Sequence, residues 1–175
     1  MDTLKIYLIR FCLISYLLII SFLTIKRKDL SLHNDEISKL LSGNYASLAV
    51  FAFILLAIGS ILLGQQINSE KAKLIRILIL AYGCCVLIAG ITKPNQVLHD
   101  VVSLLAFISV PVAAYLFAKY FKQSYTTVVL IGISLIAWPL LGFGYGERLT
   151  VYIEVLWLLW LTFKSKLLFA GKKLQ

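Results

Sequence analysis

A few ionisable side chains interrupt long apolar stretches of this sequence, and they are the residues on which chemistry could be built. Glu154 stands about six residues inside the last apolar stretch, and His99 and Asp100 are adjacent at the start of another. A histidine beside a carboxylate can be a base, a metal ligand or a helix cap. An ionisable group within hydrocarbon costs about 2–3 kcal/mol unless it is paired, protonated or hydrated. Glu154 is therefore expected to face the protein interior.

The segment 142–148 contains three glycines followed by Glu147 and Arg148, and we expect it to form a tight turn before the last apolar stretch. Residues 147, 151, 154 and 158 share one face of a helix. Arg148 lies off that face, so the expected partner of Glu154 comes from another helix, with His99 as the candidate. We predict that His99 and Glu154 line one cavity near the outer membrane surface. The candidate binding residues are His99, Asp100, Glu147, Arg148, Glu154, Ser38 and Asn95.

Recognisable catalytic and cofactor motifs are missing from the sequence. It has no Gly-rich phosphate loop, nucleophile elbow, His-Glu-x-x-His or Cys-x-x-Cys. With His33 and His99 as the only histidines, a multi-histidine metal site cannot be built. The three cysteines lie inside apolar stretches, and the adjacent pair Cys84 and Cys85 is poorly placed to bridge. We therefore expect no metal, no cofactor and no disulfide framework.

Membrane-spanning helices must position these residues. The 175 residues are 61% hydrophobic and 14% charged, with a mean hydropathy of +0.92, whereas soluble domains are about 45–50% apolar and about 25% charged. The apolar blocks hold about 20 residues each, enough to cross a hydrocarbon core of about 30 Å. A soluble fold is excluded. We predict an all-α polytopic integral membrane protein, a single six-helix domain over residues 1–175 with spans at about 4–25, 46–64, 74–92, 100–118, 126–143 and 149–163.

The longest connection, residues 26–45, has the pattern of a short amphipathic helix after the first span. Asn34 or Asp35 is a candidate N-cap, and apolar residues follow at positions 37, 40 and 41. Such a helix is expected to lie along the outer membrane interface, where it could serve as a lid.

The distribution of basic residues predicts the orientation, because six spans place both termini on one side. Eleven lysines and arginines fall on the side of the termini: Lys5, Arg10, Lys71, Lys73, Arg76, Lys119, Lys122, Lys164, Lys166, Lys172 and Lys173. Six fall on the other side: Lys26, Arg27, Lys28, Lys39, Lys93 and Arg148. The positive-inside rule favours cytoplasmic termini, although the run from Lys26 to Lys28 argues the other way. The net charge of +9 is thus explained without nucleic acid as a partner.

Short motifs along the chain resemble a known family. They are Ile-Ser-x-Leu-x-x-Gly at 37–43, Ala-Gly-Ile at 89–91 with Pro94 after it, Leu-His at 98–99, and Gly-x-x-Glu-Arg at 144–148. This order resembles the prokaryotic six-span membrane proteins named domain of unknown function 998, over roughly residues 4–163. The resemblance implies a six-span bundle in a prokaryotic cytoplasmic membrane, and it implies no activity.

Three functions remain open from the sequence. The favoured one is a non-enzymatic protein that binds membrane lipid, or serves as an accessory subunit of a partner membrane protein or a homo-oligomer. The second is an intramembrane enzyme, lipid-modifying or hydrolase-like, that uses His99, Asp100 and Glu154. Its possible nucleophiles are Ser38, Ser42 and Ser103. The third is a small-molecule transporter, although no three-plus-three repeat is visible and no charged residue reaches the bilayer centre.

Overall fold

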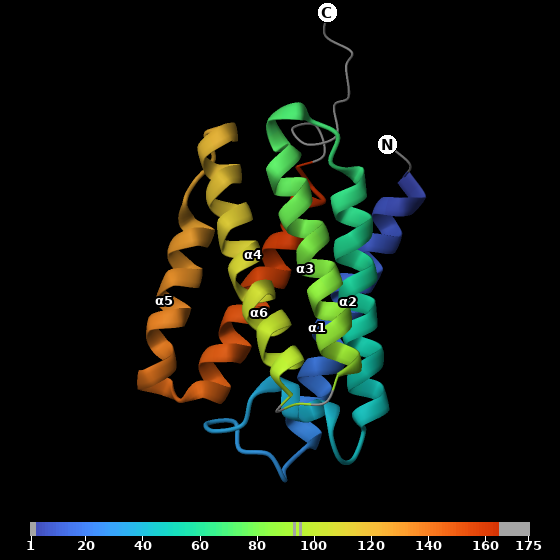
Figure 1. Cartoon of the computed structure of the whole chain (residues 1–175), viewed down its shortest axis with the longest axis vertical. Helices are drawn as coiled ribbons and strands as arrows, with labels where there is room; N and C mark the ends of the chain where they lie inside the picture. Colours follow the sequence, from blue (N-terminus) through green and yellow to red (C-terminus); the bar gives the residue numbers. More distant parts are fainter. Residues whose placement is uncertain (1–2, 93, 95, 165–175) are drawn as a thin grey trace, which may run out of the picture.

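The fold, seen in a computed structural model that describes residues 3–92, 94 and 96–164, is a bundle of α-helices (Figure 1). Within these residues no strand is present, and four helices are long and apolar enough to cross a membrane. They are α1 (Thr3–Lys26), α2 (Ala46–Gln66), α3 (Lys73–Ile91, preceded by the short helix η2, Glu70–Ala72) and α4 (Val97–Phe121). Two further helices, α5 (Thr126–Leu141) and α6 (Phe143–Leu161), run beside them. These helices indicate a membrane protein.

The helix ends lie within three residues of the expected spans, except at the start of α6. The expected turn over residues 142–148 is wrong, because Gly142 alone, with φ of +88°, separates α5 from α6. Gly144 and Gly146 instead lie within α6, where they allow other parts of the chain to pack closely against this helix. A Cβ on Gly144 would lie 2.5 Å from the Leu32 carbonyl oxygen, and one on Gly146 would lie 2.1 Å from the Trp138 ring.

The helices form a ring in which the α5–α6 hairpin is packed loosely against its neighbours on both sides. α1 packs against α2 and α6, α2 against α3, and α3 against α4, while α5 and α6 form a hairpin. α4 contacts that hairpin only sparsely. Arg10 fastens α1 to the end of α6 by donating hydrogen bonds to the hydroxyl and carbonyl oxygens of Thr162, at 2.9 and 3.2 Å. The seam between α4 and the α5–α6 hairpin and the join of α1 to α6 are both sparsely packed, and Arg10 reinforces the second.

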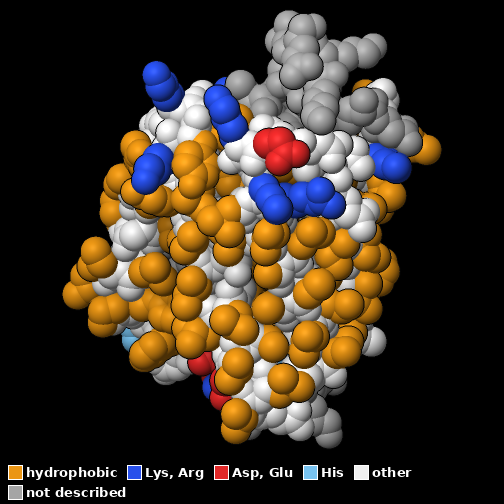
Figure 2. All heavy atoms as spheres, turned by 45° about the horizontal axis from the view of Figure 1, so that its top comes forward, with side chains coloured by type: hydrophobic (Ala, Val, Ile, Leu, Met, Phe, Trp, Pro, Cys, Tyr) orange, Lys and Arg blue, Asp and Glu red, His pale blue; other side chains and the backbone are white. Residues whose placement is uncertain are grey.

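The two ends of the bundle differ in charge. α1 begins and α6 ends at one end, which we call the terminal end, and residues 27–45 cover the other, which we call the loop end (Figure 1). On the face shown in Figure 2, hydrophobic side chains cover the middle of the bundle, and the lysines and arginines gather mainly toward the terminal end. This is the arrangement of a helical bundle in a lipid bilayer.

The short helix after α1 differs from the expected interfacial helix. It is a 3-10 turn, η1 (Ile37–Leu41), and Ile37, Ser38 and Leu40 are buried. It packs against α2, α3 and α6 rather than lying along the membrane surface. The apolar residues that suggested membrane contact instead close the open end of the bundle.

Candidate functional site

A cavity of about 50 Å³ lies between the helices toward the loop end. At about 10–15 Å³ per water, it has room for roughly three to five water molecules. Its polar lining comes from Ser38 of η1, His99 and Ser103 of α4, and Glu147 and Glu154 of α6. Its aromatic lining consists of Tyr16, Phe53, Tyr82 and Phe107. Side chains from five helices and the loop therefore meet at one small polar space.

Glu154 is the most unusual residue of this cavity. Its side chain is 1% exposed, and within the described part of the chain its Oε1 has no hydrogen-bond partner. Glu147 and Val151, which precede it on the same face of α6, line the cavity too, as their helical spacing predicts. An unpartnered buried polar group costs about 1–3 kcal/mol. A structural role alone gives no reason to keep such a group here.

His99 enters the cavity from the first turn of α4 and is held by the end of α3. Its Nδ1 lies 3.1 Å from the Ala89 carbonyl oxygen and 3.2 Å from the Thr92 hydroxyl. A carbonyl oxygen can only accept, so this contact places the ring proton on Nδ1. In the neutral ring Nε2 is then a hydrogen-bond acceptor, and no described residue donates to it.

The loop between α1 and α2 closes the outer end of the cavity and is bound directly to α6. The Ile37 N–H donates to Glu147 Oε2 at 2.6 Å, and the Gly144 N–H donates to the His33 carbonyl oxygen at 3.0 Å. Arg148 Nη1 donates to the Asp35 carbonyl oxygen at 2.6 Å. The loop is therefore a lid that α6 holds in place. Glu147 of α6 both binds the lid and lines the cavity.

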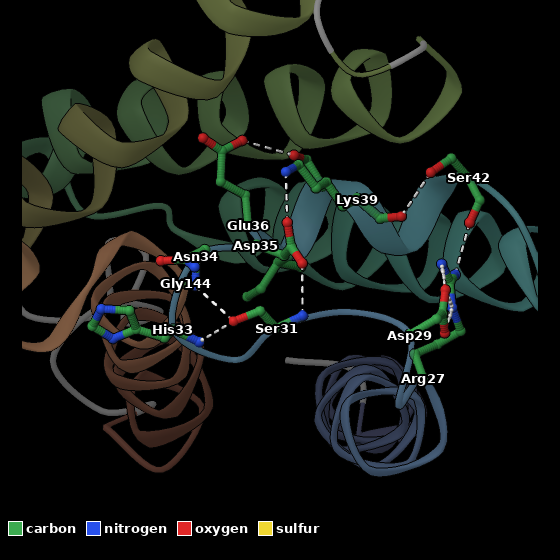
Figure 3. Close-up of polar contacts among 12 residues, drawn as sticks. Arg27, Asp29, Ser31, His33, Asn34, Asp35, Glu36, Lys39, Ser42 and Gly144 are labelled. Atoms are coloured by element: carbon green, nitrogen blue, oxygen red, sulfur yellow. Dashed lines mark hydrogen bonds and ion pairs between the residues drawn. The ribbon is translucent and has the colours of Figure 1, made fainter.

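Charged contacts stabilise the lid internally (Figure 3). Arg27, which is 4% exposed, pairs with Asp29 at 2.8 Å and donates to the carbonyl oxygens of Ser42 and Asn44 at 2.7 and 2.9 Å. The hydrogen bond from Arg27 holds the pKa of the Asp29 carboxyl below its usual value. Farther along the lid, the hydrogen bond from Lys39 and one from the backbone near Ser31 lower the pKa of Asp35 in the same way.

A larger groove of about 290 Å³ continues outward from the cavity along the seam beside α4. Cavity and groove share Ser38, His99, Ser103, Phe107 and Glu147. Glu36 and Asp100 add carboxylates to the groove, and Leu104, Trp138 and Phe143 add apolar surface. Leu104 is 60% exposed and Phe143 62%, so the groove opens toward the surface that faces lipid.

The structure brings together four of the candidate residues, Ser38, His99, Glu147 and Glu154, around the cavity. Asp100 lies in the adjoining groove. Arg148 is placed elsewhere: it points to the lid and donates to the carbonyl oxygens of Asp35 and Gly144. Asn95 lies outside the described residues.

Sequence reasoning missed the aromatic wall of the cavity and Ser103 as a lining residue. Phe53 and Phe107 look like any lipid-facing or core phenylalanine in an apolar span. Tyr16 and Tyr82 did carry a signal, because each places a hydroxyl in the middle of an apolar stretch, where it needs a polar neighbour. Ser103 follows His99 by four residues and so lies on the same face of α4.

The apolar helices indicate a polytopic helical membrane protein, and it has a buried polar cavity toward its loop end. A family model described as "Protein of unknown function (DUF998)" matches residues 11–164, and the chain belongs to this family. Neither the search of curated proteins nor the search of solved structures found a match.

Proposed function

We propose that this protein is a non-enzymatic integral membrane protein that binds a lipid or similar amphiphile in the cavity and groove at the loop end. The observation that carries the proposal is the unpartnered carboxyl of Glu154, buried in a cavity that continues into a groove on the lipid-facing side. A polar head in the cavity would provide the missing hydrogen bonds. An acyl chain in the groove would remain in contact with the bilayer.

We further propose that all six α-helices span the membrane, with the loop end outside and both termini in the cytoplasm of a prokaryotic cell. α5 has 16 residues, about 24 Å at 1.5 Å per residue, so the bilayer would thin slightly beside it. The burial of Arg27 and Arg148 supports this orientation. Basic residues at the loop end count against it under the positive-inside rule, but these two arginines are explained by their contacts within the protein. Among residues 3–92, 94 and 96–164, the exposed basic side chains of the terminal end are Lys5, Lys71, Lys73, Arg76, Lys119 and Lys122.

Binding is favoured over catalysis by the surroundings of His99. Its Nδ1 contacts a backbone carbonyl and a threonine rather than the carboxylate that would orient a general base. Ser38, a possible nucleophile, donates to Glu36 instead. Binding is favoured over transport by the tightly filled core toward the terminal end, where Leu63, Phe117 and Leu161 are at most 1% exposed.

The proposal is tested by purifying the protein in mild detergent and identifying retained lipids by native mass spectrometry. We expect the wild type and Glu70→Gln, which alters a carboxylate at the opposite end, to retain the same amphiphile. Glu154→Leu is expected to lose it, because leucine replaces the unpartnered carboxyl with an apolar side chain of similar size. Equal retention by all three proteins, or no retained amphiphile in any of them, would contradict the proposal.

A further inference from the structure

We propose that the amphiphile bound at this site carries a cationic ammonium headgroup, an inference that rests on the proposed function. The first observation is the sign of the charges. Glu147 and Glu154 line the cavity, and Glu36 and Asp100 line the groove. Among the described residues that line either space there is no lysine or arginine. A phosphate or carboxylate head would meet carboxyl groups throughout and find no cationic partner.

The second observation is the surplus of hydrogen-bond acceptors. Glu154 lines the cavity and its Oε1 is buried without a partner among the described residues. No described residue donates to His99 Nε2, which is an acceptor when the single ring proton is on Nδ1. Glu147 accepts one hydrogen bond, from the Ile37 N–H, and a carboxylate has capacity for more. A primary ammonium supplies three N–H donors. It therefore complements the lining in both charge and hydrogen bonding.

The third observation is the aromatic wall. Tyr16, Phe53, Tyr82 and Phe107 border the cavity, and Tyr16 meets Phe53 edge to face with ring centroids 6.0 Å apart. Aromatic faces attract cations, most strongly where water is excluded. Carboxylates and aromatic rings around one small space are a combination suited to an ammonium ion. The small volume of the cavity also suits a compact head.

The groove determines where the alkyl chain lies. From the cavity, the chain would pass Phe107 and then Leu104, Trp138 and Phe143 along the seam between α4 and the α5–α6 hairpin. Because the groove opens beside α4, where Leu104 and Phe143 are exposed, this is the side from which an amphiphile can enter from the membrane. The ligand class is therefore a long-chain amine rather than a soluble one.

The experiment compares dodecylamine, dodecanol and dodecanoate, which share one chain and differ in head charge, on the full-length protein in detergent. Dissociation constants are measured by native mass spectrometry at neutral pH, where the amine is protonated. We expect dodecylamine to bind at least tenfold more tightly than dodecanol, and dodecanoate to bind most weakly. Glu154→Gln should weaken dodecylamine at least tenfold, whereas Glu70→Gln should leave it unchanged. Butylamine should bind far more weakly than dodecylamine.

The outcomes separate this inference from the function on which it rests. Tighter binding of dodecanol or dodecanoate, with loss in Glu154→Leu, would overturn the ammonium assignment and keep an amphiphile site. Equal affinity for butylamine and dodecylamine would overturn the long-chain assignment. If no twelve-carbon probe binds the wild type more tightly than Glu154→Leu, the proposed function itself fails. The ranking of the three heads on the wild type decides the question even if a variant does not fold.

Discussion

Replacing Glu154 with leucine is expected to raise the stability of the ligand-free protein. The glutamate keeps a carboxyl group at 1% exposure with Oε1 unpartnered among the described residues, which costs about 1–3 kcal/mol. Leucine has a similar size and no polar atom, so the substitution removes this cost without leaving a larger void. The free energy of unfolding should therefore rise by about 1–3 kcal/mol, and the thermal midpoint by about 2–4 °C per kcal/mol.

Thr150→Val provides the matched control, one turn earlier on α6. Thr150 is as buried as Glu154 but fully engaged: its hydroxyl donates to the Gly146 carbonyl oxygen, contacts Ser134 and accepts from Trp138 Nε1. Its removal leaves the Trp138 Nε1–H without its acceptor and should destabilise the protein by about 1–3 kcal/mol. Thermal denaturation in detergent, followed by near-ultraviolet circular dichroism, measures both variants. If Glu154→Leu lowers the midpoint as Thr150→Val does, Glu154 is a structural residue and the reasoning is refuted.

Three further predictions concern the lid and the orientation. Arg27→Met removes the ion pair with Asp29 and two hydrogen bonds to carbonyl oxygens, so it should destabilise the lid by about 2–4 kcal/mol; wild-type protection of the lid from hydrogen exchange in this variant would contradict it. Because the pKa of Asp29 is lowered in the folded lid, the contribution of Asp29 to the stability of the lid is complete above its ordinary pKa of 3.8 and is lost as the pH falls through the lower pKa of the folded state. Hydrogen-exchange rates of the lid, corrected for their intrinsic pH dependence, should show this loss of stability. Asp29→Asn should abolish this pH dependence. In a cysteine-free background, Asn34→Cys should react with an impermeant reagent on intact cells and Ser124→Cys only after permeabilisation, while the reverse pattern would invert the orientation.

Much of the helical framework could be predicted because a helix that crosses a bilayer needs about 20 consecutive apolar residues, and such a run is easily recognised in a sequence. Apolar blocks of about 20 residues located both ends of α1 to α5, and the end of α6, to within three residues. The start of α6 was mispredicted because the reason for Gly144 and Gly146 lies outside α6. Their missing side chains make room for the lid and for Trp138, and glycine in sequence signals a turn as readily as a close contact.

Parts of the site could be predicted from two rules: the spacing of residues on one helix face, and the free-energy cost of exposing an ionisable side chain to hydrocarbon. Glu147 and Glu154 are seven residues apart, so their common face followed from helix geometry. Arg148 was wrongly grouped with them, because a long side chain at the edge of a helix can turn to any nearby carbonyl. Here the lid supplies the Asp35 carbonyl oxygen. The positions of Phe53 and Phe107 depend on how separate helices pack, and no pattern within one helix contains that information.

The tie between the lid and α6 joins segments that are synthesised far apart in time. Ile37 and Glu147 are separated by 110 positions, so at about 5–20 residues per second roughly 6–22 s pass before the second partner exists. Until then the nascent chain has an unanchored lid and a cavity without its acidic wall. A chain that stalls before α6 is consequently marked by a free Ile37 N–H and an open apolar loop end, features that distinguish unfinished from finished molecules.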